Sequence, residues 1–446
     1  MTQNMTSGKP LNLIIKFSIP LLIGNIFQQF YSMADTVIVG KTIGMSALAA
    51  VGATGALTFF IFGFFFGLTG GVTVVTGQRF GAGDLNGTRR SVATSIIICG
   101  AITLFMTILC TAMAGQFLKW SNTPADIFDM SLKYLRIMFC GMAALVSYNL
   151  LNSILRALGD SRTPLIFLVI SCILNIVLDF VFILSFNWGI AGAAVATVIS
   201  QAAAGWWCYL YAKKRFPLLQ LHRSDWKWDS RSVWEHLRLG LPSAFQFSVC
   251  AVGVLIFQTV LNSLGVQAVA AYTAASRIDS VMIQPAFSFA IALGAYTAQN
   301  FGAKKYMRIC RGTTVCAVTS TLFAYIIAFL AIAFSRPLTE FFVSAEQAAV
   351  LLPQVRTVLW IQGVCTVFLT MLLIYRYALQ GMGFAFIPFM GGVVELFLRG
   401  VFSRPFCDIW GYTGVCTVSP LAWAGSFVLL GFVYYYKIRR LTGRYF

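Results

Sequence analysis

Long apolar runs dominate this sequence, and their length restricts the folds that are open to it. A helix that crosses a bilayer needs about 20 consecutive, mostly apolar residues. Only 10% of the 446 residues are charged, against about 25% in a soluble domain. The sequence therefore predicts an all-α, polytopic membrane protein. The predicted transmembrane helices number twelve and cover residues 13–40, 46–77, 91–116, 127–155, 164–186, 190–212, 236–263, 267–297, 312–335, 347–379, 385–406 and 415–437.

The net charge of +18 comes from basic residues in short connectors between the apolar runs, so we expect no nucleic-acid partner. Basic connectors stay on the cytoplasmic side of a membrane. The connector 213–235 is the most basic, and the connectors on the opposite side hold single residues such as Lys41 and Lys119. We therefore expect a multi-pass protein of the cell membrane with both termini in the cytoplasm. We expect no removable signal peptide, because the N-terminus is polar and has no charged region followed by a cleavage site.

No pattern typical of enzymes or ATP-driven pumps is present in the sequence. The eleven Cys residues are scattered singly, without a CxxC pair or a Cys/His cluster, and read as small core residues. There is no phosphate-binding GxxxxGK[ST] motif and no paired nucleophile and base. We therefore expect neither catalysis nor a cofactor.

The chain contains an internal repeat on either side of the connector 213–235. The stretch "GQRFGAGD" (77–84) resembles "AQNFGAKK" (298–305), and "WGIAGAAV" (188–195) resembles "WGYTGVCT" (410–417). Gly44 and Gly265 lie 221 residues apart, and Gly159 and Gly383 lie 224 apart. We expect two six-helix bundles, residues 1–222 and 223–446, related by a pseudo-two-fold axis along the membrane normal. Rocking of two such bundles around a central cleft would give alternating access.

Four acidic residues lie within the predicted spans, where a charge is costly unless it is paired or functional. Glu395 lies four residues before Arg399, on the same helix face, so we expect a structural ion pair. Asp279 has Arg277 close in sequence, and a structural role is also favoured there. Asp35 and Asp179 have no basic residue nearby in their helices.

Neutral oxygen donors accompany these two unpaired acids. Asn175 lies one turn before Asp179. Thr197, in the next span, lies at a depth similar to that of Asp179, because Asp179 and Thr197 are each about 13 Å from the turn at Trp188. Hard cations prefer such oxygens. Two close carboxylates also suit a shared proton, because like charges oppose double ionisation. These acids and oxygen donors predict a site for Na⁺ or H⁺ in the first half. In the second half the positions that match Asn175 and Asp179 are occupied by Arg399 and Ser403.

The sequence resembles the multidrug and toxic compound extrusion (MATE) family over essentially its whole length. The stretches that carry the resemblance include "IPLLIGNIFQQFYSMADTVIVG", "LRALGDSRTP", "LNIVLDF", "WGIAGAAVAT" and "VAAYTAASRID". The resemblance implies export of cationic, often aromatic drugs in exchange for Na⁺ or H⁺. It places the cation site at Asp35, Asn175, Asp179 and Thr197, with a carbonyl from Ala193. It also implies a polar substrate pocket at Gln28, Tyr31 and Asn152.

Three other functions compete with antiport. A lipid or polysaccharide-precursor flippase of the same superfamily is the nearest alternative, but such chains commonly have additional spans and a more basic cavity. A membrane-embedded enzyme would need a catalytic pair or metal cluster, and a channel would not need the repeat. We expect organic cations and membrane lipid as partners, and a monomer. Pro20, in the middle of the first span, predicts a kink, which is either static or acts as a hinge when Asp35 changes charge.

Overall fold

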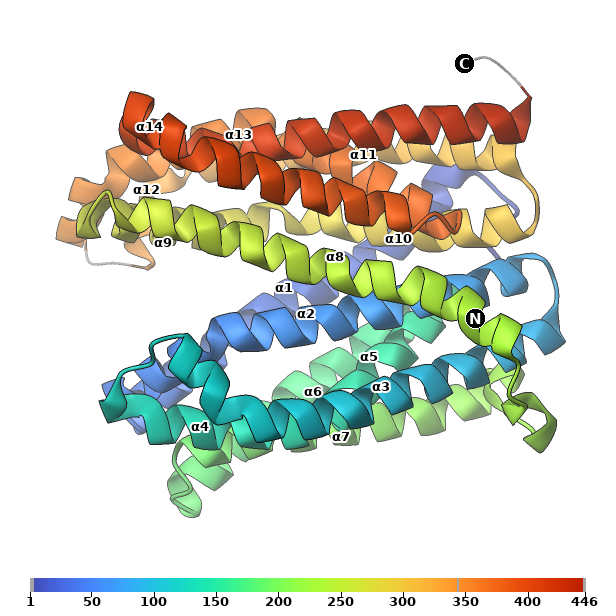
Figure 1. Cartoon of the computed structure of the whole chain (residues 1–446), viewed down its shortest axis with the longest axis horizontal. Coiled ribbons are helices and arrows are strands. Elements are labelled where there is room, and N and C mark those ends of the chain that lie inside the picture. The colour runs from blue at the N-terminus through green and yellow to red at the C-terminus, as the bar shows by residue number, and fades with distance from the viewer. Residues whose placement is uncertain (1–3, 343–344, 444–446) are drawn as a thin grey trace. The chain divides into compact units, whose positions relative to one another are not determined.

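Residues 4–342 and 345–443 are described by a computed structural model, in which nearly all of them are helical (Figure 1). Neither stretch contains a strand. Short turns accompany the helices: a π-helical turn, η1 (Val181–Ser185), and the 3₁₀ turns η2 (Pro217–Leu219) and η3 (Arg223–Trp226). The helices are α1 (Pro10–Thr42), α2 (Met45–Gly81), α3 (Leu85–Trp120), α4 (Ala125–Cys140), α5 (Met142–Ala157), α6 (Arg162–Phe180), α7 (Ile190–Arg215), α8 (Ser230–Asn262), α9 (Val266–Met282), α10 (Gln284–Gly302), α11 (Tyr306–Ala333), α12 (Ser335–Glu340), α13 (Ala345–Gly381) and α14 (Phe386–Thr442).

The described residues contain ten helical segments that are long and apolar enough to cross a membrane, one of them α9 together with α10. The pair α4 and α5 adds another span, bent by 49° at the break between the two helices. The 57 residues of α14 include Gly411, whose φ of 56° and ψ of −133° are not helical. A helix of that length would measure about 85 Å, far more than one bilayer crossing, so α14 provides two spans. The prediction of twelve spanning helices is confirmed.

The internal repeat extends to the backbone conformation of matching glycines. Gly159 and Gly383 both adopt positive φ, at 85° and 88°. Gly189 has φ 55° and ψ −135°, and its counterpart Gly411 has nearly the same angles. A residue with a side chain rarely adopts such angles. The sequence matches around these glycines therefore mark turns of the same shape in both halves.

The described helices divide between two compact units, of which the first consists mainly of Ile23–Ala244. In this unit α2 to α7 run alongside one another (Figure 1), and the first part of α8 packs against α2. A Cβ on Gly67 would come within 2.3 Å of the Ser243 carbonyl oxygen, and one on Gly71 within 2.6 Å of that of Leu239. The two glycines therefore allow the backbones of α2 and α8 to approach closely.

The second unit consists of Met5–Leu22 and Phe245–Phe446. Its core is formed by α10, α11, α13 and α14. The segment before α1 is held on this unit, because the guanidinium of Arg308 donates hydrogen bonds to the carbonyl oxygens of Gly8 (3.0 Å) and Met5 (3.2 Å). The Met5 side chain is fully buried in the same core.

The chain passes from one unit to the other inside two helices. In α1 the division falls between Leu22 and Ile23, and in α8 it falls between Ala244 and Phe245. Each division comes two residues after a buried or half-buried proline, Pro20 in α1 and Pro242 in α8. Proline removes one backbone hydrogen bond from a helix and permits a bend. The boundaries expected from the repeat, 1–222 and 223–446, leave both helices undivided.

Candidate functional site

Asp35 and Asp179 lie together in the first unit, although they come from different helices. Asp35 is on α1 and half-buried, and Asp179 is the second-last residue of α6 and fully buried. Their carboxyl groups lie close enough to interact with each other. Two carboxyl groups this close oppose double ionisation, because their negative charges repel each other. The pair therefore suits the binding of a positive charge.

Neutral oxygen atoms from α6 and α7 surround this carboxyl pair. The Asn175 side-chain amide donates to the Thr197 hydroxyl at 3.4 Å, and that hydroxyl donates to the carbonyl oxygen of Ala193 at 3.1 Å. The side chain of Tyr31 lies close enough to that of Thr197 to interact with it. The structure thus brings together the residues that the sequence suggested for a cation site, and it adds Tyr31 to them.

The local backbone explains how these groups meet. Asp179 lies two residues before the start of the π-helical turn η1, and π turns inside helices often occur at functional sites. The helix α7 packs closely on η1, because a Cβ on Gly192 would come within 3.1 Å of the Phe182 backbone. This close approach places Ala193 and Thr197 beside the end of α6.

One Asp35 oxygen fits a site for a cation or a proton. Its Oδ1 atom is buried and accepts no hydrogen bond from the described part of the chain. A buried acceptor without a partner is costly, and a bound cation or proton would remove that cost. Hard cations such as Na⁺ prefer oxygen ligands. The two carboxylates, with the nearby amide, hydroxyl and carbonyl oxygens, provide such a set.

Sequence reasoning missed Tyr134, a buried residue of α4. Its hydroxyl lies close enough to Tyr31, Asp35 and Asp179 to interact electrostatically with all three. A tyrosine in an apolar run gives little signal of its own.

The other two predicted pocket residues lie in the same unit. Gln28 is exposed on α1, one turn before Tyr31, and Asn152 is buried on α5, where it interacts with Tyr148. Within the described ranges, no hydrogen bond joins either of them to the Asp35 group. Their role as a substrate pocket remains a prediction.

The second unit contains a different buried group around Glu395. The Arg399 guanidinium lies 3.8 Å from Glu395, as the sequence spacing predicted, and Arg376 from α13 forms a second, closer ion pair with the same carboxylate. The side chains of these three residues are 5–10% exposed. Sequence reasoning considered only partners in the same helix and so missed Arg376. Arg376 lies 224 residues after Asn152 and occupies the matching repeat position.

Asp279 lies on α9 of the second unit, with the Arg277 side chain exposed two residues earlier. Residues two apart on a helix do not face each other. No ion pair joins Asp279 to Arg277 among the residues that the structure places. Arg277 therefore does not neutralise Asp279, although the two residues are close in sequence.

Comparison with known proteins supplies an independent line of evidence. A sequence model of the MatE family matches residues 20–181 and 242–403, one match in each half. The probable multidrug resistance protein YpnP of Bacillus subtilis is 29% identical over 307 residues, which cover 69% of this chain and 68% of that protein. The probable multidrug resistance protein NorM of Thermotoga maritima is 27% identical over 75% of this chain and 72% of its own length.

More distant proteins of similar sequence or structure were also found. A protein of Shewanella oneidensis named as an FAD transporter is 25% identical over 66% of both chains. A crystal structure of MATE in complex with MaL6 superposes with a TM-score of 0.93 at 23% identity and covers 99% of both chains. A transporter of the MOP superfamily from Pyrococcus furiosus superposes with a TM-score of 0.92 at 23% identity, over 99% of this chain and 98% of its own. These structures share the fold.

Proposed function

The chain belongs to the MatE family, and we propose that it is an antiporter that exports organic, mostly cationic drugs in exchange for Na⁺ or H⁺. Members of this family are membrane transporters and not enzymes. The relatives named as multidrug resistance proteins support the choice of cargo.

The observation that carries the proposal is the contact between the carboxyl groups of Asp35 and Asp179. Two carboxylates in a low-dielectric environment repel each other strongly unless a positive charge joins them. A proton shared by the pair, or a Na⁺ held with Asn175, Thr197 and the Ala193 carbonyl, would meet that need. Loss of the cation would leave a charged pair that a cationic drug or water must then stabilise.

This difference between the loaded and the empty site supplies a coupling mechanism. A ligand shifts a conformational equilibrium only by its differential affinity for the two states. We propose that the cation is bound best in one orientation of the protein and the drug in the other. Exchange then follows, because the same carboxylates cannot bind the cation and the drug tightly at the same time.

The second unit supports the assignment of coupling to the first. Glu395 is already neutralised by Arg376 and Arg399, and two guanidinium groups leave a net positive charge that disfavours a further cation. We propose that this group is structural. The transporter itself needs no cofactor besides the coupling ion, and we propose that it works as a monomer in the cell membrane.

The proposal is tested by drug efflux from membrane vesicles under an imposed Na⁺ gradient and, separately, under a pH gradient. Asp35→Asn and Asp179→Asn keep the shape of the side chain but remove its charge, so each should abolish uphill export while the protein still inserts and folds. Asp129→Asn, at an exposed position of α4, is the matched control and should export normally.

Wild-type rates for Asp35→Asn under both gradients would show that the carboxylate has no coupling role. Dependence of the wild-type protein on one gradient alone would identify the ion. Export of FAD in preference to flat organic cations would overturn the assignment of the cargo while leaving the coupling intact.

A further inference from the structure

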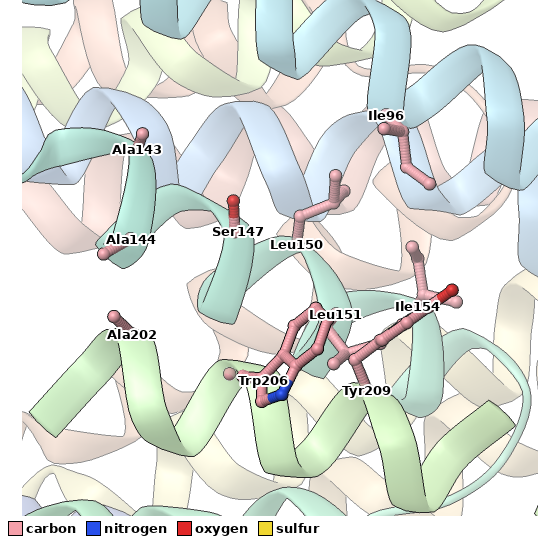
Figure 2. A pocket seen from close by; sticks show the side chains of 11 residues that line it. Ile96, Ala143, Ala144, Ser147, Leu150, Leu151, Ile154, Ala202, Trp206 and Tyr209 are labelled. Carbon is pink, nitrogen blue, oxygen red and sulfur yellow. The ribbon is translucent and has the colours of Figure 1, made fainter. Parts of the chain in front are cut away.

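The first unit carries an open apolar groove on its surface, of about 480 Å³. Figure 2 shows that α5 and α7 form its two walls and that Ile96 reaches it from α3. Around Ala202 the groove is lined by small residues, with Ala143, Ala144 and Ser147 on the opposite wall. Trp206 and Tyr209 lie along the groove from α7, and Trp206 is 60% exposed.

This groove is separate from the Asp35 group, although both use α7. Each residue of an α-helix turns it by about 100°, so the nine residues from Thr197 to Trp206 bring the side chain to the opposite face. The Thr197 side chain faces Asn175 on α6. The groove therefore opens away from the carboxyl pair.

The repeat shows why the first unit has a groove at this place. The matching positions of Ala144 and Leu151, 224 residues later, are Phe368 and Tyr375, and the match of Gly205, 222 residues later, is Phe427. In the second unit these three rings pack together. The centre of the Phe427 ring lies 6.3 Å from that of Phe368 and 6.0 Å from that of Tyr375, on which it stacks. Small side chains in the first unit leave that space open.

Positive charge lies at one end of the groove. The last turn of α7 contains Lys213, Lys214 and Arg215. The Lys213 ammonium group lies 5.9 Å from the centre of the Tyr209 ring, which itself lines the groove. An apolar channel that ends at an exposed cation fits a molecule with an apolar tail and an anionic head.

We infer that this groove binds one acyl chain of an anionic phospholipid, with the phosphate of its head group at Lys213. The groove lies within membrane-spanning stretches of α3, α5 and α7, where acyl chains are the surrounding solvent. Aromatic residues near the end of a span favour the head-group region, and basic residues there attract anionic lipids. The site is independent of the proposed antiport.

The inference is tested with purified protein in detergent, to which dioleoyl phosphatidylglycerol or dioleoyl phosphatidylcholine is added. The readouts are the thermal unfolding midpoint and the number of lipids retained in native mass spectrometry. A ligand of the folded state raises the midpoint. We expect phosphatidylglycerol to raise it more than phosphatidylcholine does and to be retained as one molecule per protein.

Variants that fill the groove should lose this effect. Ala144→Phe introduces the ring that the second unit has at the matching position, and Ala202→Phe fills the groove from the other wall. Ala101→Phe adds the same ring to an exposed position of α3 outside the groove and should behave as wild type. If one filling variant fails to fold, the other still decides the question.

The contribution of the Lys213 charge is tested with the same two lipids. Lys213→Gln should reduce the advantage of phosphatidylglycerol without changing the response to phosphatidylcholine. Lys119→Gln, an exposed position at the end of α3, should leave both responses unchanged. Equal effects of the two lipids on the wild type, or an unchanged phosphatidylglycerol effect in both filling variants, would overturn the inference. An equal loss in Ala101→Phe would also overturn it.

Discussion

Single residues differ in how clearly the sequence reveals them. Asp35 and Asp179 were predictable because an ionisable group without a basic neighbour is conspicuous in an apolar run. Tyr134 and Arg376 were not, since each acts on a residue of another helix. A sequence shows the spacing along one helix, whereas the approach of two helices depends on side-chain packing.

Glu395 allows a prediction about stability. Glu395→Gln would leave Arg376 and Arg399 buried without their common counter-charge, and removal of one partner of a buried ion pair typically costs about 3–5 kcal/mol. We expect a clearly lowered thermal unfolding midpoint in purified protein.

The control for Glu395→Gln is Asp408→Asn. Asp408 pairs with Arg404 at 3.1 Å, but both side chains are more than half exposed. Such a pair is worth about 0–1 kcal/mol, so the midpoint should hardly move. Similar midpoints for the two variants would contradict a structural role of the Glu395 group.

The predicted pocket residues allow a second prediction at this scale. Alanine at Gln28, Tyr31 or Asn152 should change which drugs are exported, because each removes a polar group from the cavity that we expect in the first unit. Tyr31→Ala should also weaken coupling, since the Tyr31 side chain lies beside Thr197 of the carboxyl site. Resistance profiles against several drugs, at matched protein levels and with Gln29→Ala as control, check this. Unaltered profiles for all three variants would place the pocket elsewhere.

At the scale of helices, the spans were predictable and their interruptions were not. Apolar composition continues through the break between α4 and α5 and through η1, so the runs give no signal there. The glycine matches of the repeat did mark the turns, because positive φ restricts the residue type. The division of α1 and α8 between two units depends on which surfaces they pack against, and no local pattern encodes that.

Pro20 is the helix feature with the clearest expected consequence. The start of α1 is held on the second unit through Arg308, while Asp35 near its other end belongs to the first unit. A bend near Pro20 would let α1 follow both units as they move. Pro20→Ala restores a backbone hydrogen bond and should stiffen this point, so we expect slower drug export at unchanged stability.

The control for this variant is Pro353→Ala, an exposed proline inside α13, which should export drug at the wild-type rate. Efflux rates and unfolding midpoints of both variants provide the measurement. If Pro20→Ala exports as fast as the wild type, the bend takes no part in the cycle.

At the scale of the whole molecule, the charge distribution predicts how the protein lies in the membrane. In the first unit the last turn of α7 contains three basic residues, whereas the last turn of α3 contains the single Lys119. Because basic connectors are retained in the cytoplasm, the loop after α7 should lie inside the cell and the connector after α3 outside.

Cysteine labelling in intact cells tests this orientation. Ser224→Cys in the loop after α7 should react with a membrane-impermeant thiol reagent only after the cells are permeabilised, whereas Ser121→Cys, after α3, should react from outside. Both positions are exposed, so access to the reagent differs only by the side of the membrane. The exposed Cys140 is replaced by Ser in both variants, and the unsubstituted parent gives the background. Labelling of Ser224→Cys from outside would invert the topology, and the lipid groove would then face the outer leaflet.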